Sequence, residues 1–220
     1  MEKASPHLQH LVMCSKSPDV TSDLGDITYS VIMEALLVHK NPPHRFMIYP
    51  VFPRWKLTIP SDILSKKPDI GLINFREEGR PFEYRLGIES NSFMDGVMAG
   101  LPDPGVVASN LEVQRVLWAA YLRAEDKAKT AVREEHFPPQ RPFDYLLFVG
   151  PYWTHVTLGP FDQENLAIPT DKESPTSGDR VADWREKMRL KQEPVYRNLW
   201  LVGTLESQRK MEEIISSTDD

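Results

Sequence analysis

Two acidic residues stand at the ends of neighbouring apolar segments in KPDIGLINFREEGRPFEYRLGIESNS, residues 66–91. Asp69 opens the first segment and Glu89 closes the second. A turn centred on Gly79 would form a hairpin in which both carboxylates lie directly opposite each other, about 5 Å apart at Cβ, where like charges repel. Mg²⁺ relieves this repulsion because it binds hard oxygen ligands. The pair therefore predicts a divalent-metal site, and without metal we expect Glu89→Gln to be at least as stable as the wild type.

The pleat of the second strand groups further polar residues with Glu89. Side chains alternate between the two faces of a strand, so Leu86 and Ile88 point into a core while Gly87, Glu89 and Asn91 point the other way. Gly87 has no side chain and would keep this polar face open. A shift of one residue in the register would separate the two opposed carboxylates.

A third carboxylate lies in a helix predicted over residues 26–39, for which Asp26 is the expected N-cap. Glu34 falls between Val31 and Val38, within the apolar stripe of this helix. A carboxylate on such a face needs a partner. The alternative is that Glu34 is a semi-exposed helix residue.

Prolines and glycines divide the chain into alternating elements. Segments rich in aromatic and β-branched residues predict strands, and apolar residues at 3.6-residue spacing predict helices. The expected order is one helix, three strands, one helix and two strands. The predicted elements are a helix at 26–39, a strand pair or one broken strand at 45–59, hairpin strands at 69–75 and 84–90, a Gly/Pro loop at 95–105, a helix at 111–135, strands at 143–149 and 152–158, and a short strand or helix start before an amphipathic helix within 195–216.

The helix at 111–135 has the clearest pattern in the chain, with Asn110 as its expected N-cap. Its basic residues could contact phosphate, but acidic residues are interleaved with them. This mixture is typical of a solvated helix face. The basic residues are Arg115, Arg123, Lys127, Lys129 and Arg133.

The order of elements, with "PD" at the start of the second strand and "ExN" in the third, resembles the PD-(D/E)XK nuclease superfamily over about residues 26–158. The resemblance implies an α/β fold with a restriction-endonuclease-like αβββαβ core, in which a mixed sheet of about five strands is flanked by two helices. It also implies that Asp69 and Glu89 hold Mg²⁺ or Mn²⁺ and that Glu34 joins them. Gln114 would be a polar residue of the second helix that faces the site.

Asn91 stands where the superfamily has its catalytic lysine. An amide carries no charge and accepts no proton at neutral pH, so the metal alone or another group, such as Lys67 or Lys56, would have to activate water. Two functions follow from the resemblance: a metal-dependent nuclease that Asn91 impairs, or a catalytically inactive nuclease-fold module that binds nucleic acid or protein. The third interpretation is structural, with Asp69 capping a strand and Glu89 a solvated strand end.

The 220 residues suffice for one substantial core. We expect a flexible N-terminal arm at 1–22, the nuclease-like domain at 23–161, a polar loop at 162–180, and a C-terminal extension at 181–220 that packs on the same domain.

Composition limits the partners and the location. The balance of 26 basic to 32 acidic residues excludes a globally basic surface, so contact with DNA or RNA would be local and salt-sensitive, or helped by a protein partner. One cysteine, Cys14, excludes an internal disulfide, and no apolar run is long enough to span a membrane. We expect an intracellular protein, cytoplasmic or nuclear, without a membrane partner.

Overall fold

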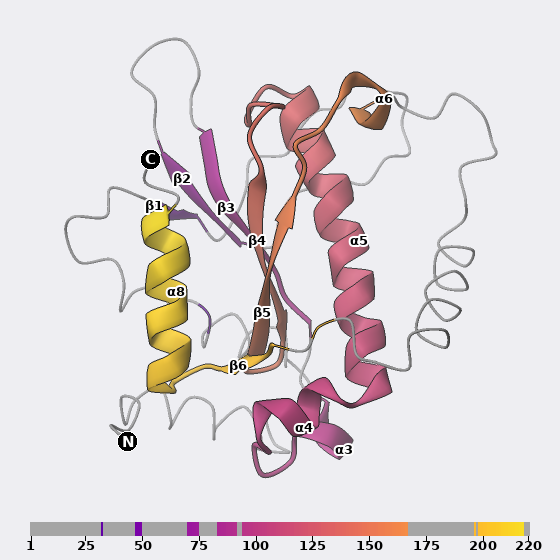
Figure 1. Cartoon of the computed structure of the whole chain (residues 1–220), viewed down its shortest axis with the longest axis vertical. Coiled ribbons are helices and arrows are strands. Elements are labelled where there is room, and N and C mark those ends of the chain that lie inside the picture. The colour runs from indigo at the N-terminus through magenta and orange to yellow at the C-terminus, as the bar shows by residue number, and fades with distance from the viewer. Residues whose placement is uncertain are drawn as a thin grey trace.

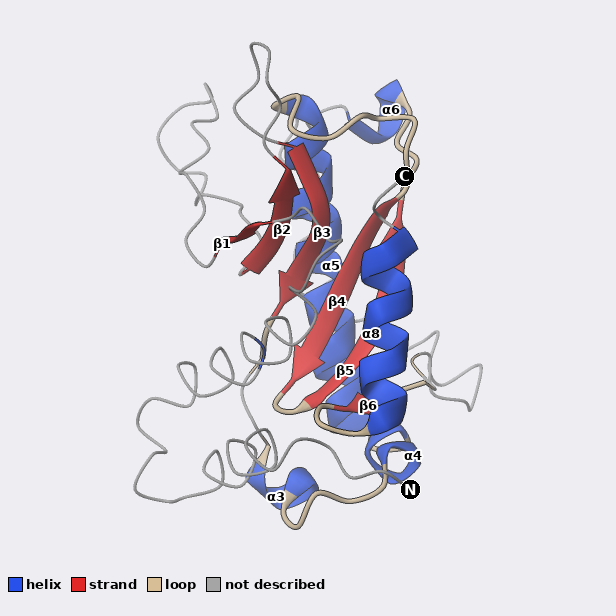
Figure 2. Ribbon diagram, turned by 90° about the vertical axis from the view of Figure 1, so that its left-hand side faces the viewer, coloured by secondary structure: helices blue, strands red, loops and turns tan. Residues whose placement is uncertain are grey.

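The computed structural model describes residues 32, 47–49, 70–74, 83–91, 94–166, 196 and 198–217. They form an α/β fold, in which a mixed sheet lies between the long helix α5 and the C-terminal helix α8 (Figures 1 and 2). The elements are β1 (Met47–Tyr49), β2 (Ile70–Asn74), β3 (Glu83–Glu89), α3 (Asp95–Met98), α4 (Pro104–Ala108), α5 (Leu111–Arg133), β4 (Phe143–Val149), β5 (Tyr152–Leu158), α6 (Gln163–Leu166), β6 (Trp200–Leu201) and α8 (Leu205–Ser217).

The six strands lie in the sheet in their order along the chain, from β1 to β6. β3 and β4 are parallel, and every other neighbouring pair is antiparallel. A parallel pair needs a long crossover connection, which here contains α5. The predicted order of three strands, a helix and two strands is confirmed, and β6 adds a sixth strand to the five expected. Of the helix predicted at 26–39, the structure describes Ile32, which is helical and fully buried.

In the half of the β2–β3 pair that lies away from the turn, the register is the one that a turn centred on Gly79 would give. Ile70 lies opposite Ile88, and Gly71 lies opposite Gly87. The register then shifts, because Leu72 pairs with Leu86 but Ile73 pairs with Tyr84. Arg85 is therefore an extra residue in β3, which is the definition of a bulge. Asp69, the residue before β2, lies outside the described residues.

Helix α5 begins where the sequence predicts. The Asn110 side chain accepts hydrogen bonds from the backbone N–H groups of Glu112 (2.9 Å) and Val113 (3.3 Å), which satisfies two donors that a helix start leaves unpaired. Three alanines at four-residue spacing, all fully buried, form the centre of the face toward the sheet: Ala120, Ala124 and Ala128. Their small side chains let the helix approach the sheet closely.

The loop predicted at 95–105 is wrong, because this segment contains α3 and the start of α4. Pro104 stands at the first position of α4, and the Asp103 side chain accepts a hydrogen bond of 2.8 Å from the N–H of Gly105. These are ordinary signals for a helix start. The sequence predicted a loop because the segment is rich in glycine and proline. A helix of four or five residues is also too short to show a periodic apolar pattern. The predicted polar loop at 162–180 likewise begins with a helix, α6.

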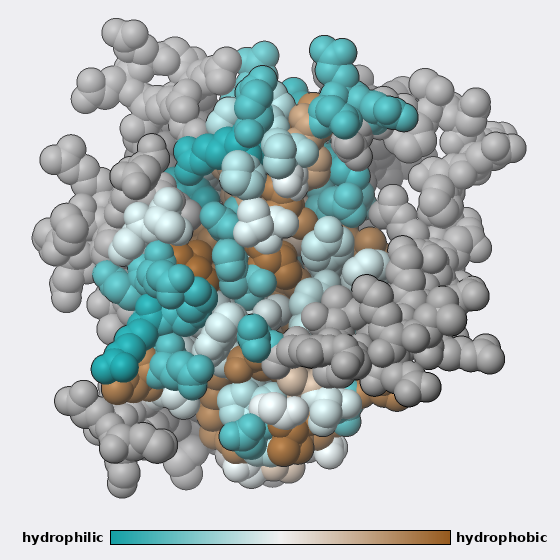
Figure 3. Space-filling view, in the orientation of Figure 1, coloured by the Kyte–Doolittle hydropathy of each residue, from teal (hydrophilic) through white to brown (hydrophobic). Residues whose placement is uncertain are grey.

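The other face of the sheet is covered by α8. Trp153 of β5 is fully buried, and its Nε1 donates a hydrogen bond of 2.8 Å to Oγ of Ser207 in α8. Met211, Ile214 and Ile215 are the buried apolar residues of α8. The outer surface over α8 is hydrophilic, whereas apolar side chains reach the surface near α3 and α4 (Figure 3). None of the described helices is long and apolar enough to cross a membrane.

Gln114 has a structural role. Its Nε2 donates to the carbonyl oxygens of Ala108 (2.7 Å) and Tyr196 (2.9 Å), and its Oε1 accepts from the N–H of Tyr196 (3.0 Å). These bonds use the amide of this fully buried side chain to join α5 to a distant segment. The expectation that Gln114 faces the site of Glu89 is therefore wrong.

Candidate functional site

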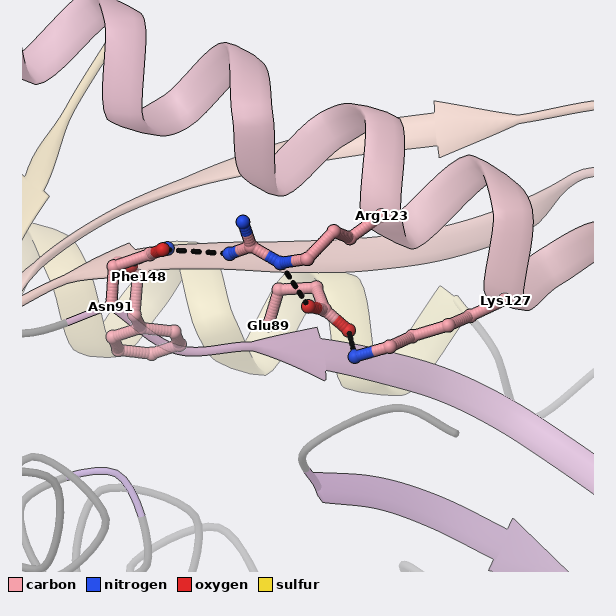
Figure 4. A network of polar contacts seen from close by, with 5 residues as sticks. All are labelled: Glu89, Asn91, Arg123, Lys127 and Phe148. Atoms are coloured by element: carbon pink, nitrogen blue, oxygen red, sulfur yellow. Dashed lines mark hydrogen bonds and ion pairs between the residues drawn. The ribbon is translucent and has the colours of Figure 1, made fainter. Parts of the chain in front are cut away.

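Glu89 lies at the end of β3, beneath α5, and its side chain is fully buried. Its Oε1 accepts a hydrogen bond from Nζ of Lys127, and its Oε2 lies 3.4 Å from Nε of Arg123 (Figure 4). The two cations are four residues apart on α5, a spacing that places them on one side of the helix. The expectation of a solvated strand end at Glu89 is wrong, because α5 covers it.

The exposure of the three charged groups differs sharply. The Lys127 side chain is 13% exposed and that of Arg123 is 45% exposed, whereas Glu89 has no exposed area. Removing a carboxylate from water is costly, and a buried ion pair seldom stabilises a fold more than packed apolar residues would. Buried charges with specific charged partners occur often at functional sites. This cluster is therefore a candidate site on physical grounds.

Asn91 is held at the end of β3 by the neighbouring strand. Its backbone N–H and its Nδ2 each donate a hydrogen bond of 2.9 Å to the carbonyl oxygen of Phe148, and its own carbonyl accepts one of 2.9 Å from the N–H of Gly150. With Nδ2 on Phe148, the Oδ1 atom is directed to α5, where it accepts a hydrogen bond of 2.7 Å from Nη2 of Arg123. Both ends of the amide are thus engaged by the protein.

The alternation of β3 is as predicted, but the polar face is not open. Gly87 pairs with Tyr145 of β4, and a methyl group at Gly87 would lie less than 3.0 Å from three carbons of the Tyr145 ring. The ring is fully buried. Gly87 therefore admits an aromatic ring between β3 and α5, and the expectation of an open face is wrong.

The basic residues of α5 divide into two groups. Arg115 pairs with Glu112 and is 48% exposed, as expected of a solvated helix face, whereas Lys129 lies 2.8 Å from Glu125 and is only 16% exposed. Lys127 does not belong to a solvated face, since it reaches Glu89. The available signal was its place at the edge of the alanine stripe, three residues after Ala124 and one before Ala128.

The structure describes two of the predicted site residues, Glu89 and Asn91, and adds Arg123 and Lys127. The other predicted metal ligands, Asp69 and Glu34, lie outside the described residues, as do Lys67 and Lys56. Within the part of the chain that is described, no three His, Cys, Asp or Glu side chains form a group that could hold a metal ion.

A second polar cluster joins β4 and β5. His155 Nε2 lies 2.7 Å from Oδ1 of Asp144, and the Thr157 hydroxyl donates a hydrogen bond of 2.8 Å to the same oxygen. Burial raises the pKa of Asp144, but these hydrogen bonds and the nearby charges of His155 and Arg141 outweigh it, so the pKa lies below its usual value. Ionised Asp144 therefore stabilises the β4–β5 pair.

The depressed pKa of Asp144 gives a pH-dependent prediction. A carboxyl group whose pKa is lowered on folding contributes stability that is complete above its unfolded pKa, about 3.9, and that disappears as the pH falls through the folded value. We therefore expect Asp144→Asn to be less stable than the wild type at pH 5, and the difference to shrink as the pH falls below about 4 and through the lowered pKa of Asp144. Urea denaturation of both proteins across this range measures it. A difference that stays constant would contradict the assignment.

Comparisons of the chain with protein-family models, with curated proteins and with solved structures give no match.

Proposed function

We propose that this protein is a PD-(D/E)XK nuclease-like enzyme that hydrolyses phosphodiester bonds of DNA or RNA with a divalent metal. The observation that carries the proposal is the fully buried Glu89 carboxylate at the end of β3, bonded to Lys127 and close to Arg123. A cluster of this kind costs stability and is therefore better explained by function than by folding.

The fold supports the same proposal. The described chain runs through three strands, α5 and two further strands, and β3 is parallel to β4 across this crossover. This is the order of elements that the resemblance implies after its first helix. Ligands of open α/β sheets bind at the carboxyl ends of strands, and Glu89 is the last residue of β3.

Of the three proposed ligands for a hard cation such as Mg²⁺, the structure describes one, Glu89. Glu89 offers carboxylate oxygens, which Mg²⁺ and Mn²⁺ bind, and the proposal assigns the remaining ligands to Asp69 and Glu34. The pairing of Ile70 with Ile88 is the register on which the assignment of Asp69 depends. When bound, the metal would neutralise negative charge and make water more acidic.

Lys127 supplies the positive charge that Asn91 lacks. Its ammonium group forms an ion pair with the Glu89 carboxylate. Lys127 comes from α5, whereas the lysine of the superfamily motif would stand at position 91, at the end of β3. In the proposed reaction Lys127 orients the attacking water and stabilises the charge that develops on the phosphate oxygens. Asn91, held by Phe148 and bonded to Arg123, acts as a positioning residue.

A panel of substrates tests the proposal. Supercoiled plasmid, single-stranded DNA and RNA are incubated with the protein in Mg²⁺, in Mn²⁺ and in a chelator. We expect cleavage of at least one substrate that requires metal and that Asp69→Ala abolishes. Cleavage that survives Asp69→Ala would come from a contaminant or from another site, and would contradict the assignment.

The alternative function is a catalytically inactive module that keeps the fold and binds nucleic acid or protein. It is favoured by one observation, the Asn91 amide, both ends of which are engaged by Phe148 and Arg123. Binding of a substrate without cleavage in either metal would select this alternative.

A further inference from the structure

We propose that Arg123 forms a phosphate-binding subsite beside Glu89, with Asn91 as the residue that positions it; the identity of the ligand, a nucleic-acid backbone, rests on the proposed function. Arg123 would donate hydrogen bonds to non-bridging oxygens of a phosphodiester next to the bond that is cut.

Exposure distinguishes Arg123 from the rest of the network. Its side chain is 45% exposed, against 13% for Lys127 and none for Glu89. A guanidinium group has five N–H donors. Nε faces Glu89 and Nη2 binds Asn91, whereas Nη1 donates no hydrogen bond to the described residues. Arg123 is therefore the most exposed of the three charged residues, and its guanidinium group has donors that the described residues do not use.

The charge of Arg123 is only partly compensated. Its distance to Glu89 is 3.4 Å, which is long for a charge-assisted hydrogen bond, and the same carboxylate is bonded to Lys127. Two other basic residues of α5 pair with acidic residues of the same helix, Arg115 with Glu112 and Lys129 with Glu125. Arg123 instead leans across to the end of β3.

The guanidinium group is held in place before any ligand arrives. Its partner Asn91 is fixed by hydrogen bonds to Phe148 and Gly150, and it contacts Arg123 through an oxygen at 2.7 Å. A planar, oriented fork of donors matches two phosphate oxygens at once, which a lysine cannot do. Prior orientation lowers the entropy cost of binding.

The test measures binding without cleavage. Fluorescence anisotropy of a labelled single-stranded DNA and of an RNA of the same sequence is recorded in a chelator over a range of salt concentrations. We expect Arg123→Gln to raise Kd about tenfold at low salt and to reduce the slope of log Kd against log salt by about one contact. Arg123→Lys should lie between the wild type and Arg123→Gln, and Asn91→Ala should raise Kd about threefold.

Arg115→Gln is the matched control, because Arg115 lies two turns earlier on the same helix and its side chain is 48% exposed. We expect its Kd to stay within about twofold of the wild type. Circular dichroism establishes that each variant is folded.

The inference is overturned if Arg123→Gln binds as the wild type does at every salt concentration, if Arg115→Gln weakens binding equally, or if the wild type binds neither oligonucleotide. Binding that depends on Arg123 while no metal produces cleavage would keep the subsite and reject the proposed hydrolysis. Cleavage by the wild type, combined with unchanged DNA and RNA binding in Arg123→Gln, would keep the proposed hydrolysis and reject the subsite.

Discussion

Replacing Lys127 by methionine is expected to lower the free energy of unfolding by about 3 kcal/mol, because it removes the nearer of the two described cations from a fully buried carboxylate. Methionine keeps the unbranched apolar stem of lysine, so the loss of packing is small. Arg123 stays near Glu89 at 3.4 Å and holds the cost toward the lower end of the range for broken buried pairs. Urea denaturation at neutral pH measures the change.

The Glu89→Gln/Lys127→Met double variant provides the internal control. It removes both charges, so we expect it to recover most of the lost stability, with a coupling energy of about 2 kcal/mol. Glu89→Gln alone should also destabilise the protein, because it removes the negative charge that faces Lys127 and Arg123. This reverses the sequence-based expectation that the substitution is neutral or stabilising, which considered only repulsion from Asp69.

Lys129→Met tests whether the effect is specific to the buried pair. Lys129 lies on the same helix and its side chain is 16% exposed, close to the 13% of Lys127, but its partner Glu125 at 2.8 Å is 27% exposed and not fully buried. The loss of Lys129 therefore leaves no fully buried carboxylate and should cost about 1 kcal/mol or less. If Lys127→Met costs no more than Lys129→Met, Glu89 does not depend on Lys127 and the buried ion pair is wrong.

Gly87→Ala is the second substitution with a large expected effect. A methyl group there would lie less than 3.0 Å from the Tyr145 ring, which is fully buried and cannot move into solvent. Overpacking of this kind typically costs 1–3 kcal/mol, and we expect about 2 kcal/mol from thermal or urea unfolding. Because the ring lies on the face that carries Glu89, the variant should also weaken any activity of the site.

Gly96→Ala is the matched control for the same substitution. Gly96 lies in α3 and a methyl group there would meet nothing within 4 Å. Alanine is the better helix former, so this variant should be as stable as the wild type or more stable by up to about 1 kcal/mol. Equal stability of the two variants would mean that Tyr145 adapts freely and that Gly87 is not required.

The sequence was sufficient to predict the elements with strong local signals. α5 follows from its periodic apolar residues and the Asn110 cap, and β4 and β5 follow from aromatic and β-branched runs on either side of Gly150. The sequence did not fix the register of β2 and β3: a turn centred on Gly79 gives the pairing seen from Ile70 to Leu72, but the pairs nearer the turn are shifted by one residue. The bulge at Arg85 was not predictable, because nothing in its neighbours' types requires an extra residue there.

Of the Glu89, Arg123 and Lys127 cluster, only the carboxylate of Glu89 was predictable from the sequence. Glu89 was identified because it ends an apolar strand, but its surroundings depend on where α5 packs against the sheet, which is a tertiary fact. In the sequence, Lys127 is one of several basic residues interleaved with acidic ones. Only its ion pair with Glu89 of β3 distinguishes it from Lys129, which pairs within α5. The face at Gly87 was expected to be open because glycine lacks a side chain, whereas a residue from another strand, Tyr145, fills it.

The central claim is that Glu89 belongs to a metal-dependent centre for phosphodiester hydrolysis. The most direct test is the single-turnover cleavage rate of the best substrate from the panel, with protein in excess, for the wild type and Glu89→Gln at a temperature where both are folded. We predict cleavage by the wild type in Mg²⁺ or Mn²⁺ and a rate lower by roughly 100-fold or more in the variant. A variant that cleaves at the wild-type rate, or a wild type that cleaves neither DNA nor RNA in either metal, would contradict the claim.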